Sequence, residues 1–326
     1  MLPQFAYVRP SSLKEAVRHL SEAKSVLHAG GTDLMGCLRE NILDAAKVVS
    51  IIGIEQLKGI HPGAGGDLSI GALTSISEVA QDPLIRQRYP VLAQGASQVA
   101  SPQLRNQGTI GGNLCQKPRC WYYRGQFHCL RKGGDMCYAA EGQNQFHAIF
   151  GSGGICYIVH PSDMAPALVA LNALVRIHGP KGRRTVPVEA FHVLPEDNVQ
   201  AETVLQAGEI VTAIEIPAPS KGLRSSYRKV RARGAWDFAL AGVALALQVD
   251  GDRVQAARVV LGGAAPVPWR CPAVEAVIKG RRLDEKTVTE AAQAAVEGAQ
   301  ALEKNSYKIT LFRGLLQEQL TALAHG

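Results

Sequence analysis

The residues best suited to chemistry in this chain are four cysteines that lie close together in the middle of the sequence. They follow a glycine-rich turn at residues 111–113 and precede a Pro-Ser-Asp tripeptide at residues 161–163. Their spacing is C-x8-C-x7-C-x18-C, at positions Cys120, Cys129, Cys137 and Cys156. Four thiolates in one segment suit a soft metal ion or an iron–sulfur cluster. Their position between two candidate parts of a cofactor site indicates electron transfer.

The spacing of these cysteines bears on which metal centre they would hold. Structural zinc sites are typically built from two tight C-x2–4-C pairs, which this sequence lacks. Long intervals suit a 4Fe-4S cluster in an extended loop, where each thiolate comes from a different stretch of chain. Four free buried thiols are the plainest alternative, but they would have to cluster by accident. Spacing therefore favours iron–sulfur over zinc, although ligand type alone separates the two poorly.

The remaining cysteines and the nearby histidines are weaker candidates for metal binding. Cys115 directly follows the glycine turn and could compete as a ligand, but we assign it to packing near the cofactor. Cys37 and Cys271 are isolated, which is typical of ordinary buried thiols. Three histidines near the segment lack metal spacing with one another and are expected at the surface or in hydrogen bonds: His128, His147 and His160.

Two glycine-rich turns have the character of phosphate-binding backbone. The first, at residues 30–33, is expected to connect a strand at 26–29 to a helix at 34–40, and the second lies at 109–114. Glycine lets backbone amides approach a phosphate, and a helix N-terminus adds further donors. Two such turns could hold one pyrophosphate from both sides. Neither matches the Rossmann or P-loop pattern, which disfavours a nicotinamide or nucleoside triphosphate site.

Asp163 precedes an expected apolar helix at residues 164–171. Ser162 or Asp163 would serve as the N-cap of that helix. The Asp163 carboxylate could also accept hydrogen bonds from a ribityl or ribose hydroxyl, and the two roles are compatible.

The order of expected elements predicts an α+β protein in three parts. Residues 1–54 read as a small α/β unit, and residues 55–220 as a second α/β unit that contains the irregular cysteine segment, residues 115–156. Residues 221–326 read as three strands followed by three helices. Strands followed by helices are typical of an α+β domain packed beside the α/β units.

Two local details of this reading can be checked against a structure. Ser12 and Glu15 are placed to form a capping box at the start of the first helix. Regular structure is expected to resume with residues 155–159, at the end of the cysteine segment.

Composition and charge exclude several classes of protein. The chain has 326 residues, is 46% hydrophobic and carries a formal net charge of +7, but its basic residues form no single tract, which argues against nucleic-acid binding. The longest apolar run, residues 238–249, is too short to cross a bilayer. The N-terminus lacks a signal-peptide pattern, and an odd count of seven cysteines does not fit a secreted disulfide framework. A cytoplasmic location is expected.

Taken in order, the motifs resemble one known family. They run Ala29-Gly30-Gly31-Thr32-Asp33-Leu34, Thr109-Ile110-Gly111-Gly112-Asn113-Leu114, Pro161-Ser162-Asp163, Ile214-Glu215-Ile216-Pro217, Tyr227-Arg228-Lys229-Val230 and Leu261-Gly262-Gly263-Ala264-Ala265-Pro266. The set is similar to the FAD-binding subunits of the molybdenum hydroxylases, the xanthine dehydrogenase and carbon monoxide dehydrogenase medium-subunit family. The resemblance implies two FAD-binding subdomains of the PCMH type, followed by a C-terminal antiparallel sheet with helices.

The resemblance also implies which residues hold FAD. The pyrophosphate and adenosine portions would lie against the two glycine turns, Asp163 would contact FAD, and Val211 and Lys229 match positions near the isoalloxazine. The implied cofactor-binding residues are Ala29, Gly30, Gly31, Thr32, Asp33, Leu34, Thr109, Gly111, Gly112, Asn113, Asp163, Val211 and Lys229.

The cysteine segment resembles two subfamilies that carry an additional 4Fe-4S cluster. They are the 4-hydroxybenzoyl-CoA reductase β subunit and the FAD subunit of bacterial periplasmic aldehyde oxidoreductase. Residues 113–116 and the pair Arg119-Cys120 recur in the reductase type, which implies Cys120 as the first ligand and places Cys115 outside the cluster. The final interval is similar to the aldehyde oxidoreductase type, so the substrate class stays open.

The resemblance implies an electron-transfer subunit without substrate-oxidising residues of its own. Its partners would be a large molybdenum-cofactor subunit and a small 2Fe-2S subunit, in a heterotrimer whose further dimerisation is left open. Electrons would pass through FAD to an external acceptor, or inward from a donor in a reductase. Export on a partner's signal also remains open. Two other classes are an FAD-dependent oxidase acting alone and a zinc-stabilised binding module.

Overall fold

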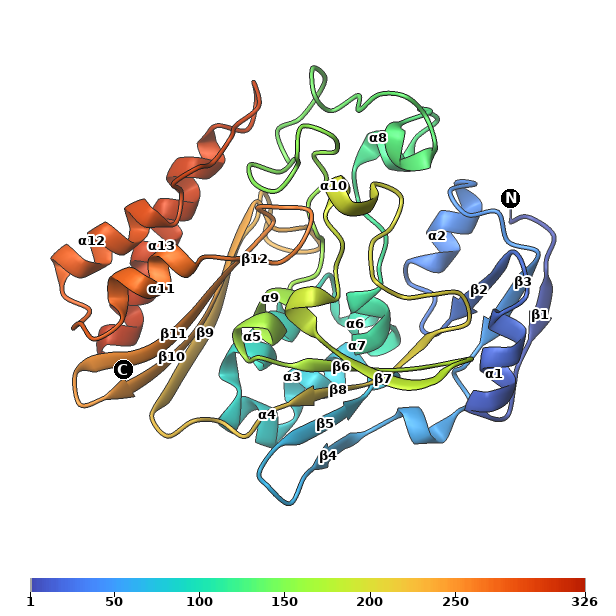
Figure 1. The fold of residues 1–326 in the computed structure, drawn as a ribbon, viewed down its shortest axis with the longest axis horizontal. Coiled ribbons are helices and arrows are strands. Elements are labelled where there is room, and N and C mark those ends of the chain that lie inside the picture. Colours follow the sequence, from blue (N-terminus) through green and yellow to red (C-terminus); the bar gives the residue numbers. More distant parts are fainter. Residues whose placement is uncertain (1, 326) are drawn as a thin grey trace.

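Three β-sheets, each with its own helices, make up the computed structural model, which describes residues 2–325 (Figure 1). The first sheet has the strand order β1-β3-β2, the second β4-β5-β8-β6-β7 and the third β12-β11-β10-β9. The first sheet is parallel, whereas the other two are antiparallel. This mixed arrangement, which ends in an antiparallel sheet with helices, confirms the predicted α+β class.

The N-terminal unit is the parallel sheet with one helix after each of its first two strands. Its elements are β1 Ala6–Val8, α1 Leu13–Leu20, β2 Ser25–His28, α2 Leu34–Arg39 and β3 Lys47–Ser50. The Ser12 side chain caps α1 by accepting from the amide of Glu15. The predicted capping box between these two residues is wrong, because the Glu15 carboxylate accepts from the amide of Ser11 (2.9 Å).

The second unit is the five-stranded sheet with helices packed on it. Its strands are β4 Ile60–Pro62, β5 Leu68–Gly71, β6 Leu174–Gly179, β7 Gly182–Pro187 and β8 Ile210–Ile216. Its helices are α3 Ile76–Gln81, α4 Pro83–Arg88, α5 Pro90–Ser97, α6 Pro102–Gln107, α7 Ile110–Leu114, α9 Met164–Ala170 and α10 Pro195–Asn198, with short 3₁₀ turns η1 Glu55–Leu57 and η3 Val188–Ala190. As expected, α9 is capped at its N-terminus, by the Ser162 hydroxyl, which accepts from the amide of Ala165 (2.9 Å).

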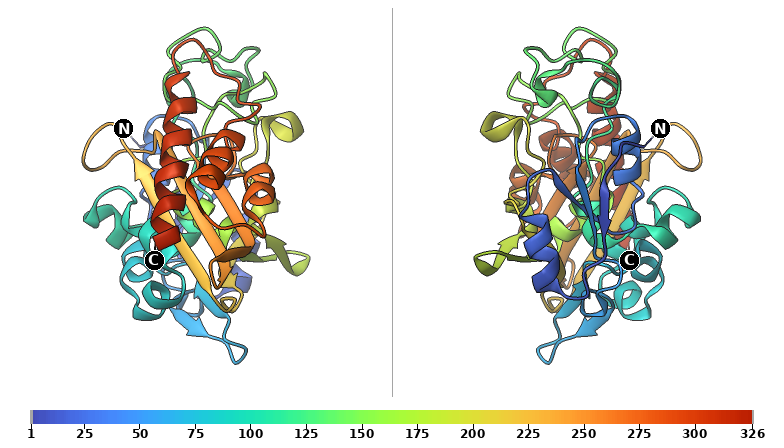
Figure 2. Two further views of the ribbon diagram at one scale, coloured as in Figure 1. Left: turned by 90° about the vertical axis from the view of Figure 1, so that its left-hand side faces the viewer. Right: turned by 90° about the vertical axis from the view of Figure 1, so that its right-hand side faces the viewer.

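The C-terminal unit is a four-stranded sheet with helices on one face, seen from the side in Figure 2. Its elements are β9 Leu223–Val230, β10 Ala241–Asp250, β11 Arg253–Gly262, β12 Trp269–Arg270, α11 Pro272–Ile278, α12 Glu285–Ala294 and α13 Tyr307–His325. In β10, Val243 and Leu245 face these helices, whereas Ala244 faces α9 on the opposite side. The strand is therefore apolar on both faces, because α5 and α9 link this sheet to the five-stranded one.

The cysteine segment, residues 115–156, has little regular structure. It contains only α8 Trp121–Arg124 and the 3₁₀ turn η2 Leu130–Lys132. The expectation that regular structure resumes at residues 155–159 is wrong: Cys156 and Ile158 are buried, but this run forms no helix and no ladder with any described strand. Among residues 2–325, no helix is both long enough and apolar enough to span a bilayer.

Candidate functional site

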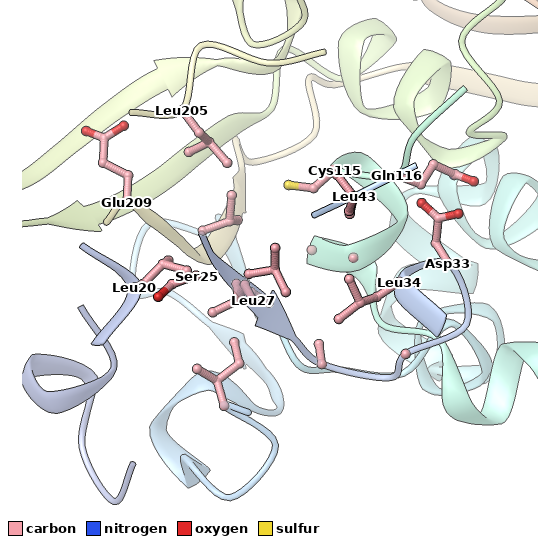
Figure 3. A pocket seen from close by; sticks show the side chains of 18 of the residues that line it. Leu20, Ser25, Leu27, Asp33, Leu34, Leu43, Cys115, Gln116, Leu205 and Glu209 are labelled. Atoms are coloured by element: carbon pink, nitrogen blue, oxygen red, sulfur yellow. The ribbon is translucent and has the colours of Figure 1, made fainter. Parts of the chain in front are cut away.

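A cavity of about 610 Å³ lies where the N-terminal unit meets the start of α7 and strand β8 (Figure 3). Leu27 lines its centre, with Asp33 towards one end and Glu209 towards the other. The cavity brings together ten of the predicted cofactor-binding residues: Ala29, Gly30, Gly31, Thr32, Asp33, Leu34, Thr109, Gly111, Gly112 and Val211. Residues separated by more than half of the chain thus share one cavity wall.

Close backbone packing brings the two glycine-rich turns together. A Cβ atom on Gly30 would lie 1.9 Å from the carbonyl oxygen of Gln107, so the first turn can rest against the chain that leads into the second only as glycine. Gly31 has φ of 70°, in the left-handed region that favours glycine. The predicted juxtaposition of the turns is therefore present, and its cause is this contact.

The second turn is the start of a short helix. The Thr109 hydroxyl accepts from the amide of Gly112 (3.1 Å) as the N-cap of α7. A Cβ on Gly111 would lie 2.9 Å from that of Ala72, so the helix packs tightly against the end of β5. Packing and capping form a helix here despite two residues with poor helix propensity.

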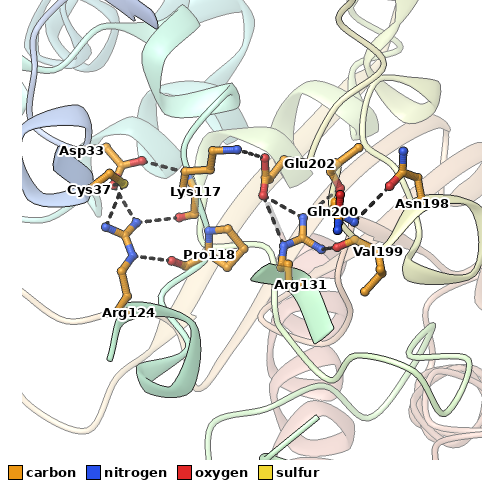
Figure 4. Close-up of polar contacts among 11 residues, drawn as sticks. Asp33, Cys37, Lys117, Pro118, Arg124, Arg131, Asn198, Val199, Gln200 and Glu202 are labelled. Carbon is orange, nitrogen blue, oxygen red and sulfur yellow. Dashed lines mark hydrogen bonds and ion pairs between the residues drawn. The ribbon is translucent and has the colours of Figure 1, made fainter. Parts of the chain in front are cut away.

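Asp33 connects the cavity to the cysteine segment. Its Oδ1 accepts from Arg124 (2.8 Å) and lies 3.0 Å from Arg119 Nη1, while its Oδ2 accepts from the Lys117 amide (2.7 Å), as Figure 4 shows in part. Arg124 also donates to Cys37 Sγ (3.2 Å). Sequence reasoning predicted Asp33 as a cofactor contact but missed its arginine partners, because charged residues in an irregular loop carry no periodic signal.

Glu202 forms a second bridge between the cavity wall and the cysteines (Figure 4). Its carboxylate pairs with Lys117, which lines the cavity, and with Arg131 (2.9 Å), two residues after Cys129. The Arg131 guanidinium is almost wholly buried and also donates to the carbonyl of Val199 (2.6 Å). The bridge holds the middle of the segment against residues 199–202, and the sequence offered no signal for it.

The four predicted metal ligands line one small cavity of about 10 Å³: Cys120, Cys129, Cys137 and Cys156. Cys115 lines the large cavity instead. Among residues 2–325, no three or more His, Cys, Asp or Glu side chains are placed to hold a metal ion. The fold therefore gathers the four thiols without arranging them around a single ion.

The thiols of this group differ in acidity. Burial raises the pKa of Cys120 to about 11. A hydrogen bond with Cys156 lowers the pKa of Cys137 to about 6, while the same bond and burial raise the pKa of Cys156.

Three predicted cofactor-binding residues lie outside the large cavity, in a buried network. Asn113 Oδ1 accepts from Ser162, which caps α9. Asp163 accepts from Tyr227 (2.8 Å) and pairs with Lys229 (2.7 Å), both on β9. Burial raises the pKa of Asp163, and the Lys229 ammonium counters that effect. Asp163 also lines a separate cavity of about 30 Å³. Its two carboxylate oxygens join the start of α9 in the second unit to β9 in the C-terminal unit.

Two sequence families match the chain. The FAD binding domain in molybdopterin dehydrogenase matches residues 3–219, and the CO dehydrogenase flavoprotein C-terminal domain matches residues 225–323. The chain therefore belongs to the FAD-binding subunit family of the molybdenum hydroxylases.

Individual relatives cover the whole chain. The aldehyde oxidoreductase FAD-binding subunit PaoB of Escherichia coli K12 is 34% identical over 323 residues, which is 97% of each chain. The carbon monoxide dehydrogenase medium chain of Hydrogenophaga pseudoflava is 29% identical and covers 98% of this chain and 97% of its own. A solved carbon monoxide dehydrogenase from the same bacterium superposes with a TM-score of 0.79 at 27% identity, over 99% of this chain and 98% of its own.

Two buried histidines hold the end of α7 in place. The rings of His160 and His192 lie 4.1 Å apart between centroids, and His192 Nε2 donates to the carbonyl of Leu114 (3.1 Å). Burial lowers the pKa of His192 to about 4 and that of His160 well below its usual value. Both rings are therefore neutral in the folded protein at pH 7.

We expect acid to destabilise the protein between about pH 6.5 and pH 4. Unfolded histidine binds a proton near pH 6.5, so in this window the unfolded state binds more protons and the free energy of unfolding falls as the pH falls. His192 alone contributes about 3 kcal/mol of this loss. Urea unfolding at several pH values measures the slope, which His192→Gln should reduce because glutamine retains a donor without titrating. An undiminished slope in that variant, compared with a control at the exposed His61→Gln, would contradict the assignment.

Proposed function

We propose that this chain carries both FAD and a 4Fe-4S cluster and transfers electrons within a molybdenum-cofactor oxidoreductase. The observation that carries the proposal is the pair of partly buried bridges, through Asp33 and Glu202, between the large cavity and the segment whose four cysteines share one small cavity. Two redox groups at these positions would be held by one connected set of side chains.

The large cavity fits FAD in size and in the donors that line it. Its volume of about 610 Å³ lies within the range of about 300–1,000 Å³ that is usual for small-molecule sites. Backbone amides at residues 30–33 and 109–112 would hold the pyrophosphate, as glycine turns and helix starts do elsewhere. Val211, Asn113, Asp163 and Lys229 would support the flavin end, directly or through β9. The bound flavin supplies the redox chemistry, while these residues orient it.

The spacing of the four cysteines suits a multi-iron cluster better than zinc. Zinc binds thiolates at about 2.3 Å, and structural zinc sites are typically built from tight C-x2–4-C pairs, which this sequence lacks. A cluster of four irons and four sulfides is larger and separates its ligands more widely. Cys120, Cys129, Cys137 and Cys156 supply the four thiolates that such a cluster takes. This spacing also argues against the zinc-stabilised binding module.

The identity to an aldehyde oxidoreductase subunit favours aldehyde oxidation over the reductase alternative for the complete enzyme. A large molybdenum-cofactor subunit and a small 2Fe-2S subunit would complete the complex, as the name medium chain in a relative suggests. An external acceptor would then take the electrons from this chain. We further propose a cytoplasmic location and the three-part division at residues 54 and 220.

We expect Gly30→Ala to lower the FAD content of the protein at least tenfold. The added methyl group would meet the Gln107 carbonyl at 1.9 Å and push the two turns apart. Gly53→Ala is the matched control, because a methyl group there meets no atom within 4 Å. Flavin released on denaturation is measured by absorbance per mole of protein. Equal flavin content in both variants would remove the large cavity from consideration as the FAD site.

We expect Cys129→Ser to abolish the cluster while most of the fold remains. Protein purified anaerobically should contain about four irons and four acid-labile sulfides beyond those of any partner, and the variant should lack them. Cys271→Ser is the matched control, since Cys271 is a buried thiol in the C-terminal core. Wild-type protein with zinc and no iron would overturn the cluster assignment, whereas full iron content in Cys129→Ser would show that the ligand set is different.

We expect tagged protein isolated from its native cells to co-purify with two subunits. One should contain molybdenum and the other 2Fe-2S clusters, and the complex should reduce an artificial acceptor with an aldehyde as donor. Mass spectrometry and metal analysis identify the partners. Flavin turnover of a small substrate by the isolated chain at the same rate would instead support the FAD-dependent oxidase acting alone.

A further inference from the structure

One histidine contacts a cysteine of the proposed cluster. His147 Nε2 lies 3.2 Å from Cys120 Sγ, and the His147 side chain is buried, with the residue 4% exposed. Among the described residues, no other imidazole forms a hydrogen bond with any of the four thiols. The contact gives Cys120 an environment that the other three cysteines do not share.

The direction of this hydrogen bond follows from the chemistry of both partners. A thiolate bound to iron can only accept, so the proton of the contact must reside on His147 Nε2. The other ring nitrogen, Nδ1, is buried and has no partner among residues 2–325. Without a proton, Nδ1 is a buried acceptor that lacks a partner, and this is tolerated better than a buried N–H donor that lacks an acceptor. The environments of both ring nitrogens therefore favour the tautomer in which Nε2 carries the proton and donates to Cys120.

The surroundings hold the ring in position before any cluster binds. The Trp121 ring packs edge-on against His147, with centroids 5.9 Å apart. The backbone on either side of the ring is tied to the C-terminal unit: Asn305 donates to the His147 carbonyl (3.1 Å) and Lys308 to the Phe146 carbonyl (3.1 Å). The donor is thus fixed by α13 and by packing.

We propose that His147 is a positioning residue that raises the reduction potential of the cluster by donating a hydrogen bond to the Cys120 thiolate. The inference rests on the proposed function, because it requires a cluster on Cys120. Reduction adds one electron, and part of its charge spreads onto the cysteine sulfurs. A hydrogen bond to sulfur therefore stabilises the reduced state more than the oxidised one. His147 acts through Cys120 and does not itself bind iron.

The test compares His147→Phe and His147→Gln in the intact, anaerobically purified protein. Phenylalanine keeps the packing against Trp121 and removes the donor, whereas glutamine places an amide N–H near the position of Nε2. His128→Phe is the control, because His128 is an exposed histidine of the same segment. Iron content is measured first, and an EPR-monitored redox titration then gives the potential of the cluster.

We expect His147→Phe to retain iron and to make the cluster about tenfold harder to reduce, which is about 59 mV for a one-electron couple. His147→Gln should recover most of the shift, and His128→Phe should show none. A cluster with wild-type potential in His147→Phe would overturn the inference while leaving the cluster assignment intact. Wild-type protein without iron would instead defeat the proposed function itself.

A measurement on the unmutated protein covers the case in which His147→Phe fails to assemble a cluster. Pulsed EPR of the reduced cluster in protein with ¹⁵N-labelled histidine should detect coupling to one histidine nitrogen through the hydrogen bond. The coupling should disappear in His147→Gln and remain in His128→Phe. Absence of histidine coupling in the wild type would overturn the inference.

Discussion

The structure depends most on the carboxylate of Asp33, which joins the cavity wall to a long segment with almost no regular structure. Such a segment cannot satisfy its backbone groups through helices or sheets, so its position must come from other contacts. Asp33 supplies them at one end by binding Arg119, Arg124 and the amide of Lys117. Asp33 lies two residues after Gly31, and both line the large cavity. Any displacement of the segment would therefore be transmitted to the candidate FAD site.

A buried ion pair, between Asp163 and Lys229, fixes the C-terminal unit to the same site. Asp163 begins α9, and Lys229 and Tyr227 reach it from β9. Loss of one partner would leave an uncompensated buried charge, which is far more costly than the pair itself is stabilising. The pair therefore fixes the position of α9 relative to β9. Ser162, the residue before Asp163, donates to Asn113 of α7. The end of β9 is therefore linked to α7, whose start lines the large cavity.

Local patterns in the sequence predicted most of this architecture, and the failures have physical causes. The strand, turn and helix around residues 26–40 are formed, and the spacing of the four cysteines correctly indicated one group of thiols. Helix α7 was read as a turn because its two glycines lower helix propensity, which the Thr109 cap and packing on Ala72 overcome. The apolar run at 155–159 was expected to be regular but pairs with no described strand. Anchors such as Glu202 are long-range contacts that no local pattern encodes.

The long-range contacts that hold the cysteine segment in place also bear on the proposed role of its cysteines. Structural metal ions stabilise small units that cannot build a core of their own. Here Arg131 and Glu202 already fasten the segment on the cavity side, and Asn305 and Lys308 fasten it on the side of α13. A purely structural metal would add little to such a segment. Electron transfer has a different requirement, because a redox centre must stay at a fixed position relative to its partner. Rigid attachment on both sides of the four thiols meets that requirement.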